Sequence, residues 1–600
     1  MKNTYIQTGE IPFFFCHDLD RVVEVQFLIM HKITDFLKHN SNWFCLGAVL
    51  LFCAVSFLIP IYISGLPDGF DLSTDLRFAS AFRDGILNGN FSPGWANDNF
   101  GFGSIGIRFY PPIAFYTLAF GEMITGDWFS AIFINLFGWM CLGCIGIYFF
   151  VKEWSSPGPA MVAGMIYAIV PQHLTEIYGY FLYAEFAAWG VMPFCFLFVT
   201  RICRGGKWLD VFLFATSYSV LILTHIPTTI MVTISLPVYV LVLLDWRRFK
   251  NIFLQLFVSI ALTLAATSYR WIQIVSEFNW LAHNDPKWST GKYGFSVWLF
   301  PNILETRKVY LLELMSWLTD ITIILTILLL IPAFPYLFTS AKTKTDPVRK
   351  IIIATTITAL FAFFMLSKPS LFIWNNAGFL QKIQFPWRWL SILSMLGVVS
   401  IALTIPLLVL RFQKIERLIV YFGLAVIVVM MLFDITQIII PSEPIPRAKF
   451  GKIEIDLQTK PIFEGWWPIW AKEEAFETSE RVMAGNRRVD VTRWESETRE
   501  FTVQRGDAVA LRVSTFYYPL WTATVNGDEA EIEMDEFGAI IIPIHSEVST
   551  VHLNFEEPYS YRIAKWLSLA TWLLFSLVII SCIRKMILTA QNRTSLLNVA

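Results

Sequence analysis

Two acidic residues that follow the first long apolar segment are the first candidates for chemistry. Asp71 and Asp75 lie four residues apart in a polar loop that covers residues 65–108. A carboxylate in such a place can act as a general base or as a ligand of a divalent metal ion. A solvated loop without a chemical role would carry the same residues, so both interpretations stay open for each aspartate.

A third carboxylate, Glu185, lies at the start of a later apolar segment, and Glu176 comes shortly before it. Placing a carboxylate within a membrane span costs about 2–3 kcal/mol, so such a residue usually faces protein or water and has a function. The alternative is a partly hydrated Glu185 at the membrane interface that pairs with an arginine.

Two arginines at the ends of apolar segments are candidates for binding an anion. Arg388 follows Trp387 directly, and Arg270 lies near the end of another segment. A guanidinium group suits bidentate phosphate binding. Arginine and tryptophan are also ordinary anchors at membrane interfaces, so that role stays open as well.

His225 lies in a tight turn between two apolar segments. A single histidine in such a turn is more often a hydrogen-bonded cap than a metal ligand. It could nevertheless complete a divalent-metal site together with Asp75. The sequence contains no phosphate-binding loop, dinucleotide fingerprint or zinc-protease motif, so nucleotide-driven transport and the common hydrolytic chemistries have no support.

The composition shows what must position these residues. The chain has 600 residues, of which 55% are hydrophobic and only 16% charged, and its mean hydropathy is +0.55. Soluble domains carry about 25% charged residues, so a soluble enzyme is excluded, as are disordered and fibrous proteins. The polar segment 441–560 is acidic, with 22 Asp and Glu against 12 Lys and Arg. This charge balance argues against nucleic acid as a partner.

Apolar runs long enough to cross a membrane predict an all-α membrane bundle with about 12 full spans. The predicted spans are Asn42–Ile63, Phe129–Val151, Ala160–Glu176, Ala184–Thr200, Leu209–Thr224, Thr228–Leu244, Ile252–Trp271, Leu312–Phe338, Ile351–Leu366, Leu390–Leu410, Val420–Ile440 and Trp566–Ile583.

The orientation follows from five basic clusters, which the positive-inside rule places in the cytoplasm together with the amino terminus. The acidic segment after residue 440 then lies outside only if an odd number of spans precedes it. We therefore interpret Pro111–Thr125 as a half-span or interfacial helix. The alternative is that it crosses and another short segment does not.

Four regions follow from this pattern. Residues 1–41 form a cytoplasmic amphipathic segment, residues 42–440 the membrane domain, and residues 561–600 a final span with a cytoplasmic tail. Residues 441–560 alternate polar and apolar side chains in short runs, and Asn526-Gly527 is a strong signal for a hairpin turn. We expect this region to be an extracytoplasmic antiparallel β-sandwich or jelly-roll.

The first outer loop also contains motifs that resemble a known family. The acidic residues after the first span, and the aromatic residue before two prolines, resemble the GT-C membrane glycosyltransferases. The closer resemblance is to a bacterial branch often labelled 6-pyruvoyl-tetrahydropterin-synthase-related membrane proteins. The motifs are Gly89-x-x-x-Pro93-x-Trp95, Gly101-x-Gly103, Phe109-Tyr110-Pro111-Pro112 and Gln384-Phe385-Pro386-Trp387-Arg388.

The resemblance implies a GT-C-like fold in a bacterial inner membrane. It also implies a sugar transfer from a polyprenyl-phosphate donor to an extracytoplasmic glycan, lipid or protein acceptor. Asp75, or next Asp71, matches the family's base or metal ligand, the metal being Mg or Mn, and Glu185 would assist. The expected substrate-binding residues are Arg388, Arg270, Trp387, Tyr110, Tyr183 and Glu176.

Two other functions stay open. A non-catalytic protein that binds or transports a polyprenyl-linked glycan would keep the arginines and tolerate loss of Asp75. A membrane scaffold whose β domain recruits a partner would be indifferent to mutation of the loop carboxylates.

Overall fold

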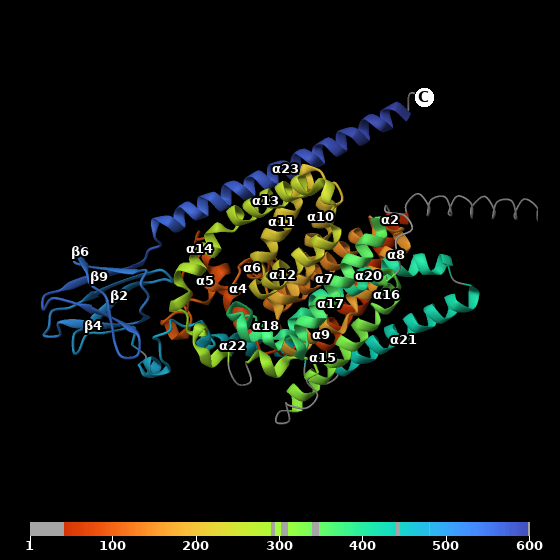
Figure 1. Ribbon diagram of the computed structural model, residues 1–600. Helices are drawn as coiled ribbons and strands as arrows, with labels where there is room; N and C mark the ends of the chain where they lie inside the picture. The colour runs from red at the N-terminus through yellow and green to blue at the C-terminus, as the bar shows by residue number, and fades with distance from the viewer. Residues whose placement is uncertain are drawn as a thin grey trace, which may run out of the picture.

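A helical bundle with a β domain at one end forms the chain in the computed structural model (Figure 1). The structure describes residues 41–289, 294–301, 310–338, 347–411, 413–439, 444–478 and 480–597. The predicted amphipathic segment 1–41 lies outside the described residues except for Ser41.

Ten helical stretches among the described residues are long and apolar enough to cross a membrane. Each has at least 18 residues, which at about 1.5 Å per residue cover about 27 Å, close to the thickness of the hydrocarbon layer. They are Ser41–Ser64 (α2 Ser41–Cys53 and α3 Ile59–Ser64), Trp128–Lys152 (α7), Tyr183–Cys203 (α10), Ile226–Leu243 (α12), Trp246–Ala266 (with α13 Phe249–Ala266), Trp317–Phe338 (with α15 Tyr310–Leu328 and α16 Phe334–Phe338), Pro347–Leu366 (α17), Pro386–Arg411 (with α20 Leu390–Arg411), Lys414–Ile439 (α21) and Tyr559–Lys585 (within α23 Tyr559–Leu597). The predicted class of fold, a multi-span helical membrane domain, is confirmed, while the number of crossings stays a prediction.

Shorter helices complete this domain. They are α4 Leu72–Leu87, α5 Gly106–Phe109, α6 Ile113–Thr125, α8 Pro157–Ala168, α9 Pro171–Leu174, α11 Trp208–Ile222, α14 Ser268–Glu277, α18 Leu371–Asn376 and α19 Gly378–Gln381. With 13 residues, α6 is as short as the sequence led us to expect.

Two of the predicted spans differ from the structure. The run Leu209–Thr224 forms α11, which has only 15 residues. The run Ala160–Glu176 is broken, because α8 ends at Ala168 and Val170 is extended. Pro171 explains the break, since proline disfavours helical backbone in the residue before it and has no N–H to donate.

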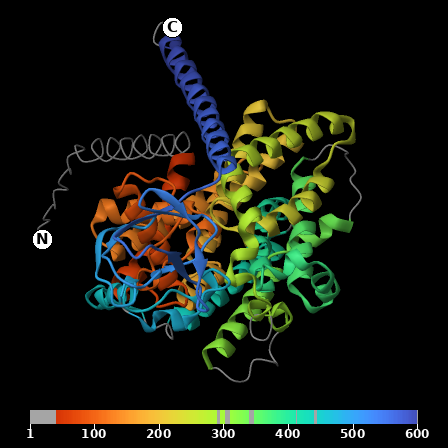
Figure 2. The same cartoon turned by 90° about the vertical axis from the view of Figure 1, so that its left-hand side faces the viewer.

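The β domain and the α20–α21 connection lie at opposite ends of the bundle. Figure 1 shows α23 leaving the β domain and running along the bundle to the far end, where the α20–α21 connection also lies. Viewed from the β-domain end, the blue strands lie in front of the red and orange amino-terminal segments (Figure 2). The location of the β domain outside the cytoplasm stays a prediction.

The β domain is a sandwich of two antiparallel sheets. Four strands run in the order β1-β4-β8-β7 and five in the order β2-β3-β9-β5-β6. Asn526 and Gly527 both have positive φ and join β5 to β6 in a hairpin, as predicted. The strands are β1 Val482–Met483, β2 Val489–Trp494, β3 Thr498–Val503, β4 Ala510–Phe516, β5 Trp521–Val525, β6 Asp528–Ala530, β7 Glu533–Met534, β8 Ala539–Pro543 and β9 Ser549–Phe555.

The segment before the sandwich is helical. Residues 444–478, which we call the strap, contain α22 Gly451–Thr459 and several short helical turns. A bridge from Leu66 to Ile445 and another from Leu281 to Pro468 attach the strap to two loops of the membrane domain. The predicted β region 441–560 therefore begins with a helical part that contacts the bundle.

Candidate functional site

Helix α4 holds the two loop aspartates. Asp71 is its N-cap residue and Asp75 lies one turn later, where its N–H donates to Asp71 O at 2.8 Å. Residues four apart share one face of a helix. Asp75 is only 3% exposed and its Oδ2 has no hydrogen-bond partner among the described residues, while Asp71 is half-buried.

The first loop packs tightly against the residues that precede α10. Asp71 N donates to Tyr180 O at 3.3 Å, and a Cβ on Gly69 would lie 2.4 Å from Cβ of Phe181. Phe181 itself has φ +55°, which is strained for a bulky residue. It follows a π-helix, Thr175–Tyr180, an element often found at functional sites. The strained turn thus fixes where α10 begins.

Glu185, in the first turn of α10, forms an ion pair with Arg388. The distance from Arg388 Nε to Glu185 Oε2 is 2.8 Å, and the two side chains are 9% and 1% exposed. Arg388 Nη1 also donates to Ile383 O at 2.7 Å. Glu185 thus pairs with an arginine as the alternative interpretation expected, but as a buried residue and not a hydrated one. Gln384, just before this arginine, has φ +65°, so a second strained residue flanks the site.

The residues around this ion pair interact electrostatically. The Tyr110 hydroxyl is within reach of the charges of Asp71, Asp75, Glu185 and Arg388, and Arg388 also acts on Glu176. We call Asp71, Asp75, Glu176, Glu185 and Arg388 the Arg388 cluster. The structure therefore brings together residues from α4, the π-helix, α10 and the start of the span that contains α20.

Burial raises the pKa of both aspartates on α4. Burial raises the pKa of Asp71 to about 6, although the Arg388 charge opposes the rise. Burial and the Asp71 charge raise the pKa of Asp75 well above its ordinary value, while the backbone N–H of Tyr183 lowers it. Two acids in one buried place cannot both ionise easily.

His225 lies near the cluster and is the N-cap of α12. Its Nδ1 is 2.8 Å from Thr228 Oγ1, and its ring lies 6.5 Å from that of Tyr110. Burial and the Arg388 charge hold the pKa of His225 well below its ordinary range, so it is a neutral cap. No group of three His, Cys, Asp or Glu in the described part of the chain could hold a metal ion. The cluster does not fit a divalent ion bound by protein ligands alone, and metal dependence stays a prediction.

Aromatic rings cover one side of the cluster. Tyr180 stacks on Trp387 with ring centres 5.5 Å apart, and Trp387 stacks on Phe385 at 5.6 Å. The Arg388 guanidinium lies 5.8 Å from the Trp387 ring centre. Tyr183, by contrast, has its hydroxyl engaged by Thr117 and by Trp139 Nε1, each at 3.2 Å. Its contribution to the site is therefore its backbone N–H.

Arg270 lies apart from the Arg388 cluster. Its Nη1 donates to the carbonyl oxygens of Ile107 and Arg108, at 3.0 and 2.8 Å, and to Gln273. No contact between Arg270 and a carboxylate of the cluster occurs among the described residues. Of the two arginines expected to bind substrate, only Arg388 pairs with an acid of the cluster among the described residues, whereas Nη1 of Arg270 donates to carbonyl oxygens of α5.

A buried network that the sequence analysis missed joins the first loop to the β domain. Arg108 donates through Nε and Nη2 to both oxygens of Glu277, each at 2.7 Å, and both side chains are fully buried. Tyr518 donates to the same carboxylate at 2.6 Å, and Glu557 accepts from Arg108 Nη1 at 3.1 Å. The available signal was Arg108, a charged residue in the apolar stretch after Gly106. Its partner Glu277 is distant in sequence, so the pair could not be predicted.

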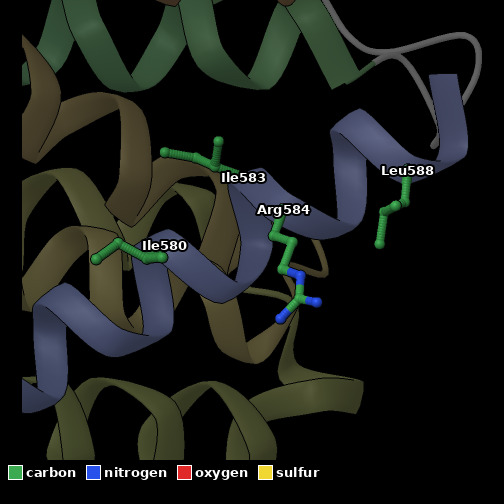
Figure 3. Close-up of a pocket in the computed structure, with 4 residues that line it drawn as sticks. All are labelled: Ile580, Ile583, Arg584 and Leu588. Carbon is green, nitrogen blue, oxygen red and sulfur yellow. The ribbon is translucent and has the colours of Figure 1, made fainter. Parts of the chain in front are cut away.

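Gln172 was also missed, although it is a polar residue inside a predicted span. It is fully buried and donates to Glu176 Oε1 at 3.3 Å. A shallow hollow elsewhere, on α23, is lined by Ile580, Ile583, Arg584 and Leu588 (Figure 3) and includes no predicted site residue.

Comparisons with known proteins give a family and several distant structures. No curated protein matches the sequence. Apo ArnT from Cupriavidus metallidurans is 16% identical over 64% of this chain, with a TM-score of 0.38, and the match covers 63% of the ArnT chain, under two thirds. The arabinofuranosyltransferase AftD from Mycobacteria is 16% identical, with coverages of 66% and 27% and a TM-score of 0.40. The oligosaccharyltransferase AglB from Archaeoglobus fulgidus is 14% identical, with coverages of 68% and 56% and a TM-score of 0.36.

The family match covers most of the membrane domain. The model described as the 6-pyruvoyl-tetrahydropterin synthase related domain, a membrane protein, matches residues 107–439, more than half of the sequence. The branch expected from the loop motifs is thereby confirmed, and the chain belongs to the 6-pyruvoyl-tetrahydropterin synthase related family of membrane proteins.

Proposed function

We propose that this protein is an integral membrane glycosyltransferase of the bacterial inner membrane, which transfers a sugar from a polyprenyl-phosphate donor to an extracytoplasmic acceptor. One observation carries the proposal: Asp71, Asp75, Glu185 and Arg388, from three separate segments, meet in one buried place. Acids that can accept a proton and a guanidinium that can bind a phosphate are the two groups that this transfer needs.

The transfer is an inverting displacement. The acceptor hydroxyl oxygen attacks C1 of the sugar from the face opposite the phosphate, and the new C–O bond forms while the bond from C1 to the phosphate oxygen breaks. The hydroxyl proton passes to the Asp75 carboxylate, with Asp71 as the alternative base. A buried carboxylate with a raised pKa is a stronger base when it is ionised.

Arg388 neutralises the polyprenyl phosphate that leaves with the electron pair of the broken bond. Its Nε and Nη1 are used by Glu185 and by Ile383 O, and among the described residues no acceptor engages Nη2. The amino-terminal ends of α10 and α12 lie beside the cluster, and helix amino termini attract anions. Glu185 orients the guanidinium.

The β domain and the strap close the outer side of the site, and the acceptor is a glycan, lipid or protein that approaches there. The α4 residue Arg77 donates to the strap oxygens Asp456 O and Lys460 O at 3.1 and 2.6 Å. These contacts support a role of the strap in holding the helix that carries both aspartates.

Transfer of labelled sugar by membranes that contain each variant tests the proposal. We expect Asp75→Asn, Asp71→Asn and Glu185→Gln to lower transfer, the first by about 100-fold or more, because general-base catalysis contributes about that much. Glu122→Gln is a matched control, because Glu122 is a part-buried carboxylate that pairs with Arg83. Full activity in all three site variants would refute the enzymatic proposal. Retained binding of polyprenyl phosphate without any transfer would favour a glycan-binding protein.

A further inference from the structure

The Arg388 cluster contains an excess of hydrogen-bond acceptors without partners. Asp75 Oδ2, Gln172 Oε1, Glu176 Oε2 and Glu185 Oε1 are all buried, and none accepts a hydrogen bond from another described residue. Their side chains are between 0% and 3% exposed. Buried polar atoms are almost always paired with protein, water or a ligand, so four such oxygens in one place indicate an occupant that is not part of the chain.

The protein supplies few donors for these oxygens. Gln172 Nε2 already donates to Glu176 Oε1. Arg388 Nε faces Glu185 and Nη1 donates to Ile383 O, and the proposed function assigns Nη2 to the phosphate. An occupant that satisfies the oxygens must therefore bring its own O–H or N–H groups. Each buried acceptor that a ligand leaves without a hydrogen bond costs about 1–3 kcal/mol of binding free energy. The site therefore favours ligands that carry donors in the right places.

The charges of the cluster also favour a ligand without a carboxylate. Four carboxylates, those of Asp71, Asp75, Glu176 and Glu185, share the cluster with one guanidinium. Among the described residues, none of them is ion-paired with a second lysine or arginine. If the acids are ionised, they repel a further carboxylate. If they hold protons, they do so because the site already resists negative charge. Away from the guanidinium of Arg388, where the donor's phosphate is expected, a ligand group with a charge of −1 is disfavoured in both cases.

We infer that the Arg388 cluster, together with Gln172, is the subsite for the donor's sugar, and that it accepts a sugar whose contacting groups are hydroxyls or an ammonium and rejects one with a carboxylate or sulfate. This inference rests on the proposed function, since it assumes a lipid-linked donor. Gln172 and Glu176 are the specificity-determining residues. The phosphate of the donor lies at Arg388, and the sugar lies against the acceptor oxygens.

Binding to the full chain in lipid nanodiscs tests the inference with three probes: undecaprenyl phosphate, undecaprenyl-phosphate-glucose and undecaprenyl-phosphate-glucuronate. The two sugars differ only in a hydroxymethyl group or a carboxylate. We expect glucuronate to bind at least about tenfold more weakly than glucose. Equal affinity for the two sugars, with undecaprenyl phosphate bound, overturns the inference alone. Failure of all three to bind overturns the proposed function and the inference with it.

Two variants then test which residues discriminate between the two sugars. Glu176→Gln should reduce the glucose-to-glucuronate ratio at least about threefold, and Gln172→Glu should increase it, because each changes one charge beside the sugar. Glu122→Gln should leave the ratio as in the wild type. An unchanged ratio in both site variants would overturn the assignment of these residues. If either variant fails to fold, the wild-type ratio still decides the inference.

Discussion

Replacing Arg108 by methionine should weaken the attachment of the β domain by about 3–5 kcal/mol. The substitution removes both hydrogen bonds of 2.7 Å to Glu277 and leaves a fully buried carboxylate that has no cation beside it among the described residues and accepts from the Tyr518 hydroxyl at 2.6 Å. Breaking a buried ion pair from one side costs about that much, because the remaining charge is uncompensated. The double variant Arg108→Met/Glu277→Gln removes that charge as well, so we expect it to lose less than the sum of the two single variants.

Hydrogen exchange of the β-strand amides in the purified protein measures the free energy of opening. Arg505→Met is the matched control, since Arg505 pairs with Glu547 on the exposed surface of the same domain, and we expect it to cost less than about 1 kcal/mol. A cost below about 1 kcal/mol for Arg108→Met, or strictly additive single variants, would refute the reasoning.

Three further results follow from the site. Asp71→Asn should stabilise the protein at pH 8 and not at pH 4. The pKa of Asp71 is about 6 in the folded state against an ordinary 3.8, so the protonated carboxyl favours folding below pH 4. Up to about 3 kcal/mol of folding free energy is lost as the pH rises through 6. Equal melting shifts at both pH values would contradict this. Arg388→Lys should lower the transfer rate at least about tenfold, because an ammonium cannot hold the carboxylate and the carbonyl in the fork geometry; steady-state kinetics with undiminished kcat would argue against it. Gly69→Ala should reduce transfer, since its Cβ would lie 2.4 Å from Phe181, whereas Gly47→Ala, with nothing within 4 Å, should not.

Much of the architecture could be predicted from local patterns. Alternation of polar and apolar residues located most strands of the sandwich, and the Asn526-Gly527 turn fixed one hairpin. Long apolar runs located the helices, because a helix that crosses hydrocarbon must be apolar over most of its length. The break at Pro171 was not foreseen, although the proline and the polar residues Gln172 and His173 that follow it were visible in the sequence. The strap was also missed, because its helical turns are too short to give a periodic pattern.

Part of the site could be predicted from the positions of its residues along the chain. Asp71, Asp75, Glu185 and Arg388 could be proposed because each lies at the outer end of a predicted span, and such ends share one side of the membrane. Whether a side chain at the outer end of a span contacts the acids or a backbone carbonyl depends on helix packing. Arg270 contacts backbone carbonyl oxygens for this reason. Pairing between distant residues, such as Arg108 and Glu277, has no local sequence signature.

The strap contacts also have a consequence for biosynthesis. The α4 helix is among the first elements to leave the ribosome, yet Arg77 finds its backbone partners only at Asp456 and Lys460, and the loop after it needs Glu557. The pair of aspartates therefore reaches its final place only after nearly the whole polypeptide has been made. A truncated chain lacks the contacts that hold α4, so the proposed site is assembled last.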